Sequence, residues 1–219
     1  MIEDAAEPWF LTRPVRVGWI PGFRQAESLK LSVSCFLTSM NSPAISIRRA
    51  RHEPSEAEAL ADVLMDCVAG GASIGFMQPL SRAKAVAFWE GVLASAARGE
   101  RIVLVAEDAA SGLVGTVQLI LTMPDNQPHR ADVAKMQVHR RARRRGVGAA
   151  LLRAIEDEAR RTGRTLLVLD TVTGGEAERL YSSLGWQRCG VIPNYALWPQ
   201  GGLCSTTVFY RELGADGGC

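Results

Sequence analysis

The spacing of apolar residues changes repeatedly along this chain, and each change marks the expected start of a new element. Residues 45–50 alternate between apolar and polar side chains, as in a half-buried strand. Pro54 then opens a predicted helix whose apolar stripe ends at Gly70. Ser81 caps a second predicted helix that runs to about Arg98. This part of the pattern therefore predicts one strand followed by two helices.

A hairpin and a further strand are predicted next. Residues 101–107 are almost all apolar, residues 109–112 contain turn formers, and residues 113–121 are again strand-like. After a loop with a proline at each end, residues 132–138 form another extended segment. These segments predict three consecutive strands.

The clearest helical pattern covers residues 147–161 and ends at Gly163. Residues 165–170 follow as an apolar run, which is typical of a central parallel strand. Together with the preceding strand, this helix and this run predict a right-handed βαβ unit. A short helix over residues 176–184 comes next.

Two loops are candidates for contact with a substrate. Residues 70–77 form a glycine-rich loop between the first two helices, and this loop is either a substrate-recognition loop or a plain connector. Residues 193–202 are predicted to form a long loop between two final strands, 185–191 and 205–211. Tyr195 on that loop either lines a substrate pocket or is an ordinary loop aromatic.

The two ends of the chain lack the regular pattern. Residues 1–43 contain scattered aromatic residues and prolines without a clear period, which predicts a poorly ordered or loosely docked extension. Met40 is an alternative start of the protein, since the regular pattern begins directly after it. The predicted domain spans residues 44–213, and residues 214–219 are expected to form a flexible tail.

Composition narrows the class of protein. The 219 residues are 47% hydrophobic and 22% charged, with a net charge of +2, as in a soluble globular protein. This net charge is too small to indicate nucleic-acid binding by itself. No apolar run approaches the roughly 20 residues of a membrane span, so no membrane partner is expected. The acidic N-terminus does not resemble a signal peptide.

The cysteines and histidines indicate a protein without metal. The chain has five cysteines, which are widely spaced and form no Cys-x-x-Cys pair. We therefore expect reduced thiols, a cytoplasmic location and no metal site. The three histidines are scattered along the sequence and suggest no ligand cluster.

A basic loop with two glycines is the strongest chemical signal in the sequence. Five arginines, at positions 140, 141, 143, 144 and 145, precede Gly146 and Gly148. The loop lies between a predicted strand and a predicted helix, where free backbone N–H groups and a helix N-terminus favour a phosphate. Because five neighbouring arginines repel one another, we expect a polyanion to lie among them. The sequence predicts a phosphate-ester site here.

Two motifs resemble those of the GNAT superfamily of N-acetyltransferases. Arg143-x-x-Gly146-x-Gly148 is similar to the superfamily's Gln/Arg-x-x-Gly-x-Gly/Ala motif, and Leu180-Tyr181-x-x-Leu184-Gly185-Trp186 is similar to its later signature. The predicted order of elements fits the superfamily from about Ile45 to Leu213. The resemblance implies an α/β (α+β mixed) fold in three layers: a mostly antiparallel mixed sheet of six to seven strands with a parallel βαβ unit, flanked by about four helices.

Three further segments are similar to tabtoxin-resistance-type acetyltransferases. They are Gly70-Gly-Ala-Ser-Ile-Gly-Phe-Met77, Arg130-Ala-Asp-Val-Ala-Lys135 and Leu169-Asp-Thr171. The resemblance implies transfer of an acetyl group from acetyl-CoA to the primary amine of a small molecule, such as an amino-acid-like toxin or antibiotic, and thus a role in resistance.

The resemblance also implies which residues bind acetyl-CoA. The backbone N–H groups of Arg144, Arg145, Gly146, Val147, Gly148 and Ala149 are expected to bind the pyrophosphate, and Arg143 is the first position of the motif. The segment Met136-Gln137-Val138 is expected to pair with the pantetheine arm. A backbone N–H near Gln137 or Val138 is the expected donor to the thioester oxygen.

Three side chains are candidates for proton transfer. Asp132 precedes Arg143 by eleven residues, where many GNAT enzymes have a glutamate base, and its shorter side chain favours a water relay. Asp170 ends an apolar strand and is either catalytic or a cap of the next loop. The resemblance implies that both carboxylates act on the amine, but a large stagger of the strands would place them well over about 10 Å apart. On these grounds Asp132 is preferred for proton removal and Asp170 for substrate binding. Tyr181 is the superfamily's usual acid for the leaving thiolate, although it also fits a buried helix face.

Other functions were weighed against small-molecule acetylation. The arginines could serve a nucleic-acid-binding protein, but no aromatic residue interleaves them and the following helix is acidic. A peptide or protein N-acetyltransferase and a GNAT-like domain without activity are further alternatives. The sequence favours an enzyme with a small-molecule amine partner, no nucleic acid and possible homodimerisation.

Overall fold

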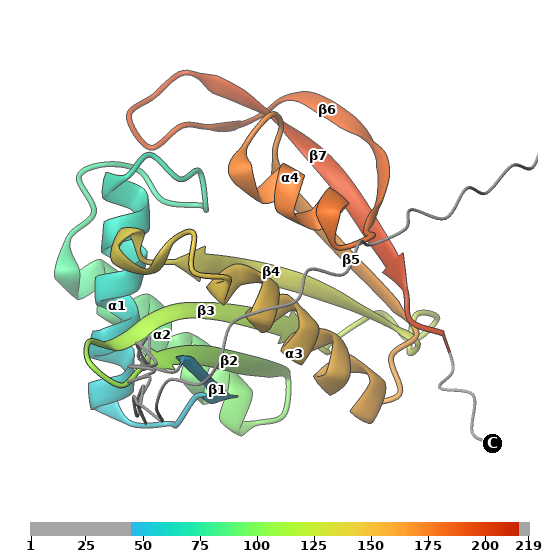
Figure 1. The fold of residues 1–219 in the computed structure, drawn as a ribbon, viewed down its shortest axis with the longest axis horizontal. Coiled ribbons are helices and arrows are strands. Elements are labelled where there is room, and N and C mark those ends of the chain that lie inside the picture. The colour runs from blue at the N-terminus through green and yellow to red at the C-terminus, as the bar shows by residue number, and fades with distance from the viewer. Residues whose placement is uncertain (1–44, 215–219) are drawn as a thin grey trace, which may run out of the picture. The chain divides into compact units, whose positions relative to one another are not determined.

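A computed structural model of the protein describes residues 45–214 (Figure 1). These residues belong to one compact unit, Asn41–Cys219. The predictions for residues 1–43, for Met40 and for residues 215–219 lie outside the described residues.

A single seven-stranded sheet runs through the described domain in the order β1-β2-β3-β4-β5-β7-β6. Its strands are β1 (Ile45–Arg49), β2 (Arg101–Asp108), β3 (Gly112–Ile120), β4 (Arg130–Val138), β5 (Leu166–Val172), β6 (Gln187–Leu197) and β7 (Leu203–Glu212). The β4–β5 pair is parallel and the other pairs are antiparallel. The predicted mixed α/β fold is therefore confirmed.

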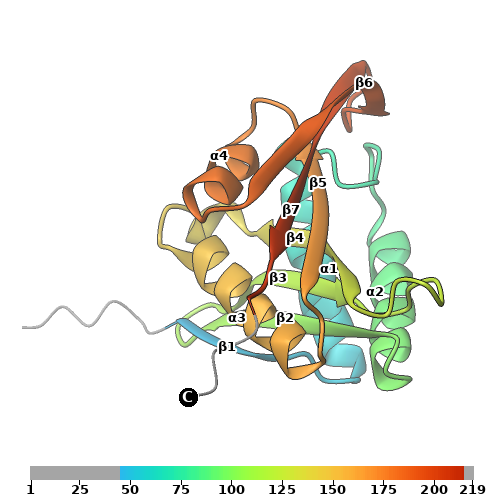
Figure 2. The same cartoon turned by 90° about the vertical axis from the view of Figure 1, so that its right-hand side faces the viewer.

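Four α-helices cover the sheet from both sides (Figure 2). They are α1 (Pro54–Ala69), α2 (Arg82–Ala97), α3 (Val147–Arg161) and α4 (Glu176–Ser183). A short 3₁₀ helix, η1 (Arg140–Ala142), was not predicted from the sequence. All four predicted helices begin within a residue of their expected positions.

The alternation of side chains in β2 explains the two hydrophobic layers. Ile102, Leu104 and Ala106 belong to a core cluster with α3, α4 and their strands. Val103 and Val105 belong to a second cluster with α1 and α2. Because successive residues of a strand point to opposite faces, a continuous apolar strand needs helices on both faces.

The sheet opens between its two central strands. β4 and β5 pair only where residues 130–132 face residues 166–168, and they then diverge (Figure 1). Lys135 and Met136 of β4 lie opposite Val117 of β3 alone, which makes a β-bulge, and Lys135 has a positive φ of 51°. The bulge redirects β4 away from β5, so the β5-facing edge of β4 from Val133 onward has no strand partner among the described residues.

The end of the chain differs from the predicted long loop. β6 continues to Leu197, and its last residues pair with the start of β7, so Tyr195 lies in a strand. The loop was predicted because of Pro193, since proline usually interrupts a strand. β6 is an edge strand with an irregular register between Ile192 and Ala196, and such positions tolerate proline because its nitrogen needs no ladder partner.

Candidate functional site

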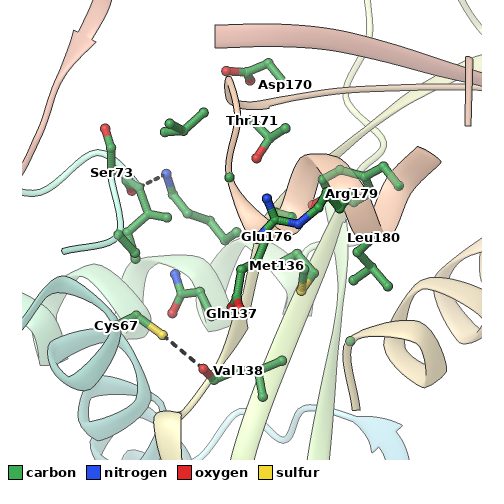
Figure 3. Close-up of a pocket in the computed structure, with 18 of the residues that line it drawn as sticks. Cys67, Ser73, Met136, Gln137, Val138, Asp170, Thr171, Glu176, Arg179 and Leu180 are labelled. Atoms are coloured by element: carbon green, nitrogen blue, oxygen red, sulfur yellow. Dashed lines mark hydrogen bonds between the residues drawn. The ribbon is translucent and has the colours of Figure 1, made fainter. Parts of the chain in front are cut away.

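A cavity of about 940 Å³ lies where β4 and β5 diverge. Its walls come from β4, β5, the N-terminus of α3, one face of α4, the loop over residues 70–75, and β6 with β7 (Figure 3). Residues 70–75 and Tyr195, both candidates for contact with a substrate, thus border the cavity. A cavity of this volume accommodates a large ligand or two smaller ones.

The N-terminus of α3 presents free backbone N–H groups to one end of this cavity. Gly146 precedes the helix with φ of 78°, and Arg144 also has a left-handed backbone, with φ of 62°. The first helical residues, Val147, Gly148 and Ala149, line the cavity, and the first turn contains no acidic residue. A helix N-terminus of this kind attracts an anion.

The arginine run divides into two groups. Arg143 and Arg144 line the cavity. Arg140 binds Asp66 at 2.9 Å, Arg141 donates to two carbonyl oxygens of the β2–β3 hairpin, and Arg145 binds the buried Asp108 at 2.7 Å. The other two also have acceptors of the protein, since Arg143 Nε donates to the Val138 carbonyl oxygen at 3.2 Å and Arg144 lies 3.4 Å from Glu176. The sequence argument that the run needs a polyanion therefore does not hold. Arg145 in particular does not line the cavity.

Gly148 keeps the cavity open beside the helix N-terminus. A Cβ atom at this position would lie 3.0 Å from Leu180 Cδ2 and 3.8 Å from Met136 Cε. Leu180 and Met136 line the same cavity (Figure 3). A side chain at position 148 would thus crowd Leu180 and narrow the cavity, whereas at Gly146 glycine is favoured by the left-handed backbone.

The predicted pantetheine segment forms the floor of the cavity. Met136, Gln137 and Val138 all line it, and the carbonyl oxygen of Val138 accepts a hydrogen bond from Cys67 Sγ (Figure 3). The same oxygen accepts a hydrogen bond from Arg143 Nε. The side chain of Gln137 is buried, and its amide has no hydrogen-bond partner among the described residues. The free edge of β4 can pair with an extended ligand that carries amide groups.

Asp170 lies within β5, which continues to Val172 and does not end at Asp170 as expected from the sequence, and it lines the cavity. Its carboxylate accepts a hydrogen bond of 2.8 Å from Thr206 Oγ1 on β7 (Figure 3 shows Asp170 beside Thr171). The hydrogen bond orients one carboxylate oxygen and leaves the other available to a ligand.

Asp132 lies near Asp170 but outside the lining of the cavity. The register pairs Asp132 with Val168, so Asp170 is only two residues farther, about 7 Å along the strand. The large stagger considered from the sequence is therefore absent. Asp132 forms an ion pair of 3.0 Å with Arg130. Burial raises the pKa of Asp132; Arg130 opposes this shift and Asp170 adds to it.

Tyr181 is a buried residue of α4 at the wall of the cavity. It is 4% exposed, and its ring packs against those of Trp186 and Phe209, with centroids 5.9 Å apart in both pairs. Burial raises the pKa of the Tyr181 hydroxyl well above its usual value, and the charge of Asp170 adds to this effect. The hydroxyl therefore remains a proton donor at neutral and mildly alkaline pH.

Sequence reasoning missed Lys135, which also lines the cavity. Its Nζ donates a hydrogen bond of 2.9 Å to the carbonyl oxygen of Ile74. Burial lowers the pKa of Lys135, and the charge of Asp170 opposes the shift. From the sequence, Lys135 is an ordinary polar residue of a strand. Its place in the cavity depends on the β4 bulge, which the sequence pattern does not reveal.

Two classes of site are not found in the part of the chain that the structure describes. Over residues 45–214, no group of histidine, cysteine, aspartate and glutamate side chains is arranged to hold a metal ion. Over the same residues, no helix has the length and apolar character needed to cross a membrane.

Comparison with known proteins gives a family match over the strands and helices that form most of the cavity. Residues 99–188 match the model of the acetyltransferase (GNAT) domain. This segment contains β2 to α4 and therefore the basic loop, Asp132, Asp170 and Tyr181.

Solved structures share the fold over most of the chain. A protein from Salmonella typhimurium, provisionally assigned as an acetyltransferase and solved with its cofactor acetyl-CoA, has 23% identity and a TM-score of 0.64, with 80% of this chain and 97% of that chain covered. A provisionally assigned phosphinothricin N-acetyltransferase has 20% identity, a TM-score of 0.66 and coverages of 78% and 100%. The ribosomal-protein-alanine N-acetyltransferase from Brucella melitensis has 23% identity, a TM-score of 0.66 and coverages of 77% and 99%.

At these identities the solved structures show the fold alone. The family model adds that residues 99–188 resemble an acetyltransferase domain. The match includes the basic loop at the α3 N-terminus and the diverging strands β4 and β5. Residues 99–188 therefore match a GNAT acetyltransferase domain, within a fold that solved acetyltransferase structures share over most of the chain.

Proposed function

We propose that this protein transfers the acetyl group of acetyl-CoA to the primary amine of a small molecule. One observation carries the proposal: the anion-binding end of α3, the free edge of β4 and the side chains of Asp170 and Tyr181 all border one cavity. A phosphate-bearing thioester and an amine can therefore meet there.

The residues at the α3 end fit the phosphates and the arm of acetyl-CoA. The N–H groups of Val147, Gly148 and Ala149 would bind the pyrophosphate, and Arg143 and Arg144 would add positive charge. The edge of β4 beyond Val133 would pair with the amides of the pantetheine arm. An N–H near Gln137 or Val138 would donate to the thioester oxygen.

Asp170 is better placed than Asp132 to remove the proton from the amine. Asp170 lines the cavity, whereas Asp132 is paired with Arg130 outside the lining. The amine nitrogen forms a bond to the acetyl carbon, the carbon–sulfur bond breaks, and the proton of the amine passes to Asp170. Where the acceptor arrives as an ammonium, Asp132 would take the proton that this group loses before the attack, through a water molecule. This reverses the preference drawn from the sequence.

Tyr181 is proposed to protonate the departing thiolate. Tyr181→Phe is expected to lower kcat about tenfold to hundredfold, because a proton donor in the transition state is lost. The KM values for acetyl-CoA and the amine should change less than about threefold, since the ring packing is kept. Steady-state kinetics would measure both.

The pH profile provides a second measurement for Tyr181. Because burial holds its pKa above the usual value, wild-type kcat should show no loss from ionisation of Tyr181 up to about pH 10. Tyr210→Phe is the matched control, since Tyr210 bonds Gln187 away from the cavity lining. An unchanged kcat in Tyr181→Phe would remove this assignment.

Gly146 allows the phosphate site to be tested by charge alone. Gly146→Asp is expected to bind acetyl-CoA about tenfold more weakly than Gly146→Asn, because the two side chains have the same shape but only aspartate repels phosphate. Both residues tolerate the left-handed backbone at this position. Isothermal titration calorimetry would compare the two. Equal affinities would show that the phosphates bind elsewhere.

The acceptor is proposed to be an amino-acid-like molecule, such as a toxin or antibiotic. The structural relative assigned as a phosphinothricin N-acetyltransferase agrees with this class, and the ribosomal-protein-alanine N-acetyltransferase illustrates the alternative of a peptide amine. A thiol-release assay with acetyl-CoA over amino acids, aminoglycosides, polyamines and peptides tests the proposal. Turnover of peptides alone, or of no amine, would contradict it.

A further inference from the structure

Lys135 has a charge that the proposed reaction does not use. It lies in the wall of the cavity, and it forms no ion pair within residues 45–214. The neutral carbonyl of Ile74 accepts one hydrogen bond from its ammonium group, which has three N–H donors. A partly buried ammonium without an anionic partner is costly, so a ligand that supplies an anion would be stabilised there.

The backbone fixes the position of this lysine. Lys135 is the left-handed residue of the β4 bulge, a conformation that non-glycine residues rarely adopt. Its Nζ also lies against the glycine-rich loop, where a Cβ at Gly75 would come within 3.2 Å of it. The side chain is therefore held at the boundary between β4 and the loop over residues 70–75.

Asp170 lies on the opposite wall. Asp170 lies two residues beyond Val168, the last β5 residue paired with β4, and Lys135 lies three residues beyond its partner Asp132. The charges of Asp170 and Lys135 are close enough to influence each other, yet the two side chains form no ion pair. The cavity thus presents a cation on β4 and an anion on β5, with the Met136–Val138 segment adjacent.

We propose that Lys135 binds a carboxylate of the acceptor, so that this enzyme selects amines that carry a carboxylate. The inference rests on the proposed function and names the group that the acceptor site recognises. An ammonium directed to Asp170 and a carboxylate directed to Lys135 match the two walls, and both contacts are charge-assisted hydrogen bonds. Polyamines and other purely cationic amines are disfavoured, because Lys135 repels them.

A structural role for Lys135 makes a different prediction. If Lys135 only tethers the loop through Ile74, its removal should impair every acceptor to the same extent. If it binds a carboxylate, its removal should impair amino acids and spare their carboxamides. Matched pairs of an amino acid and its carboxamide therefore separate the two roles.

The test measures kcat/KM for such pairs with wild-type protein, Lys135→Gln, Lys135→Arg and the control Lys84→Gln. Lys84 is exposed on α2 and does not line the cavity. Wild type should prefer the acid at least about tenfold, and Lys135→Gln should lower kcat/KM for the acid about thirtyfold, mainly through KM. The carboxamide should change less than about threefold, and Lys135→Arg should recover part of the loss.

Three results would overturn the inference: equal turnover of acid and carboxamide by wild type, equal losses for both in Lys135→Gln, or turnover confined to amines without an anionic group. Calorimetry with acetyl-CoA should give the same affinity for wild type and Lys135→Gln. Absence of thiol release with every amine, despite acetyl-CoA binding, would instead contradict the proposed function itself.

Discussion

Asp170→Asn is expected to lower kcat by about a hundredfold to ten-thousandfold, because the variant cannot accept the proton of the amine. The amide oxygen can still accept the hydrogen bond from Thr206, so β5 and β7 should remain in place. Acetyl-CoA affinity should stay within about threefold of wild type, because the variant leaves the α3 N-terminus and the free edge of β4 unchanged. Stopped-flow or steady-state thiol release, together with calorimetry, would measure these effects.

Asp132→Asn is the matched comparison for this prediction. Asp132 is paired with Arg130 and does not line the cavity, so its loss of kcat should be smaller than that of Asp170→Asn. The opposite order would return the role of base to Asp132, as the sequence alone suggested. Equal and large losses in both variants would indicate that the two carboxylates act as one unit.

Gly148→Val is expected to weaken acetyl-CoA binding at least about a hundredfold. A Cβ already approaches Leu180 to 3.0 Å, and the two methyl groups of valine would fill the space between Leu180 and Met136. A ligand phosphate would then lose access to the first N–H groups of α3. Calorimetric titration with acetyl-CoA would measure the loss.

The fold should survive this substitution. The nearest atoms are the ends of flexible side chains, and valine has a higher helix propensity than glycine. Gly91→Val on α2 is the control, because a Cβ there meets no atom within 4 Å. A thermal melt would confirm folding of both variants. Wild-type affinity in a folded Gly148→Val protein would contradict a binding site at this position.

The elements that place the basic loop could be predicted from the sequence because their patterns are local. The helix α3 begins at Val147 and ends at Arg161, as its apolar stripe predicts, and the apolar run over residues 165–170 falls in β5, which pairs in parallel with β4. The succession of strand, glycine-bearing loop and helix then locates the phosphate site without tertiary information.

The partners of the individual charges could not be predicted in the same way. Arg145 meets Asp108 and Arg140 meets Asp66 only after the sheet and α1 have assembled. Such contacts join residues that are far apart in the sequence. The sequence alone therefore suggests one basic patch, although the arginines bind different partners in the fold. The arginines available to a ligand are therefore fewer than the motif implies.

The bulge at Lys135 and the length of β6 were missed for a related reason. An extra residue in a strand is visible only against its partner, as when Lys135 and Met136 face Val117. Pro193 reads as a loop residue until β6 is known to lie at the edge of the sheet. The separation of Asp132 and Asp170 likewise depended on the β4–β5 register, which the sequence does not contain.

Hydrogen–deuterium exchange with and without acetyl-CoA tests the proposal that acetyl-CoA binds between β4 and the N-terminus of α3. Peptides that cover residues 133–138 and 143–150 should exchange more slowly when acetyl-CoA is bound, and peptides from β1 and α2 should show no change. Exchange that remains unchanged in both former segments, at a concentration where calorimetry shows saturation, would contradict it.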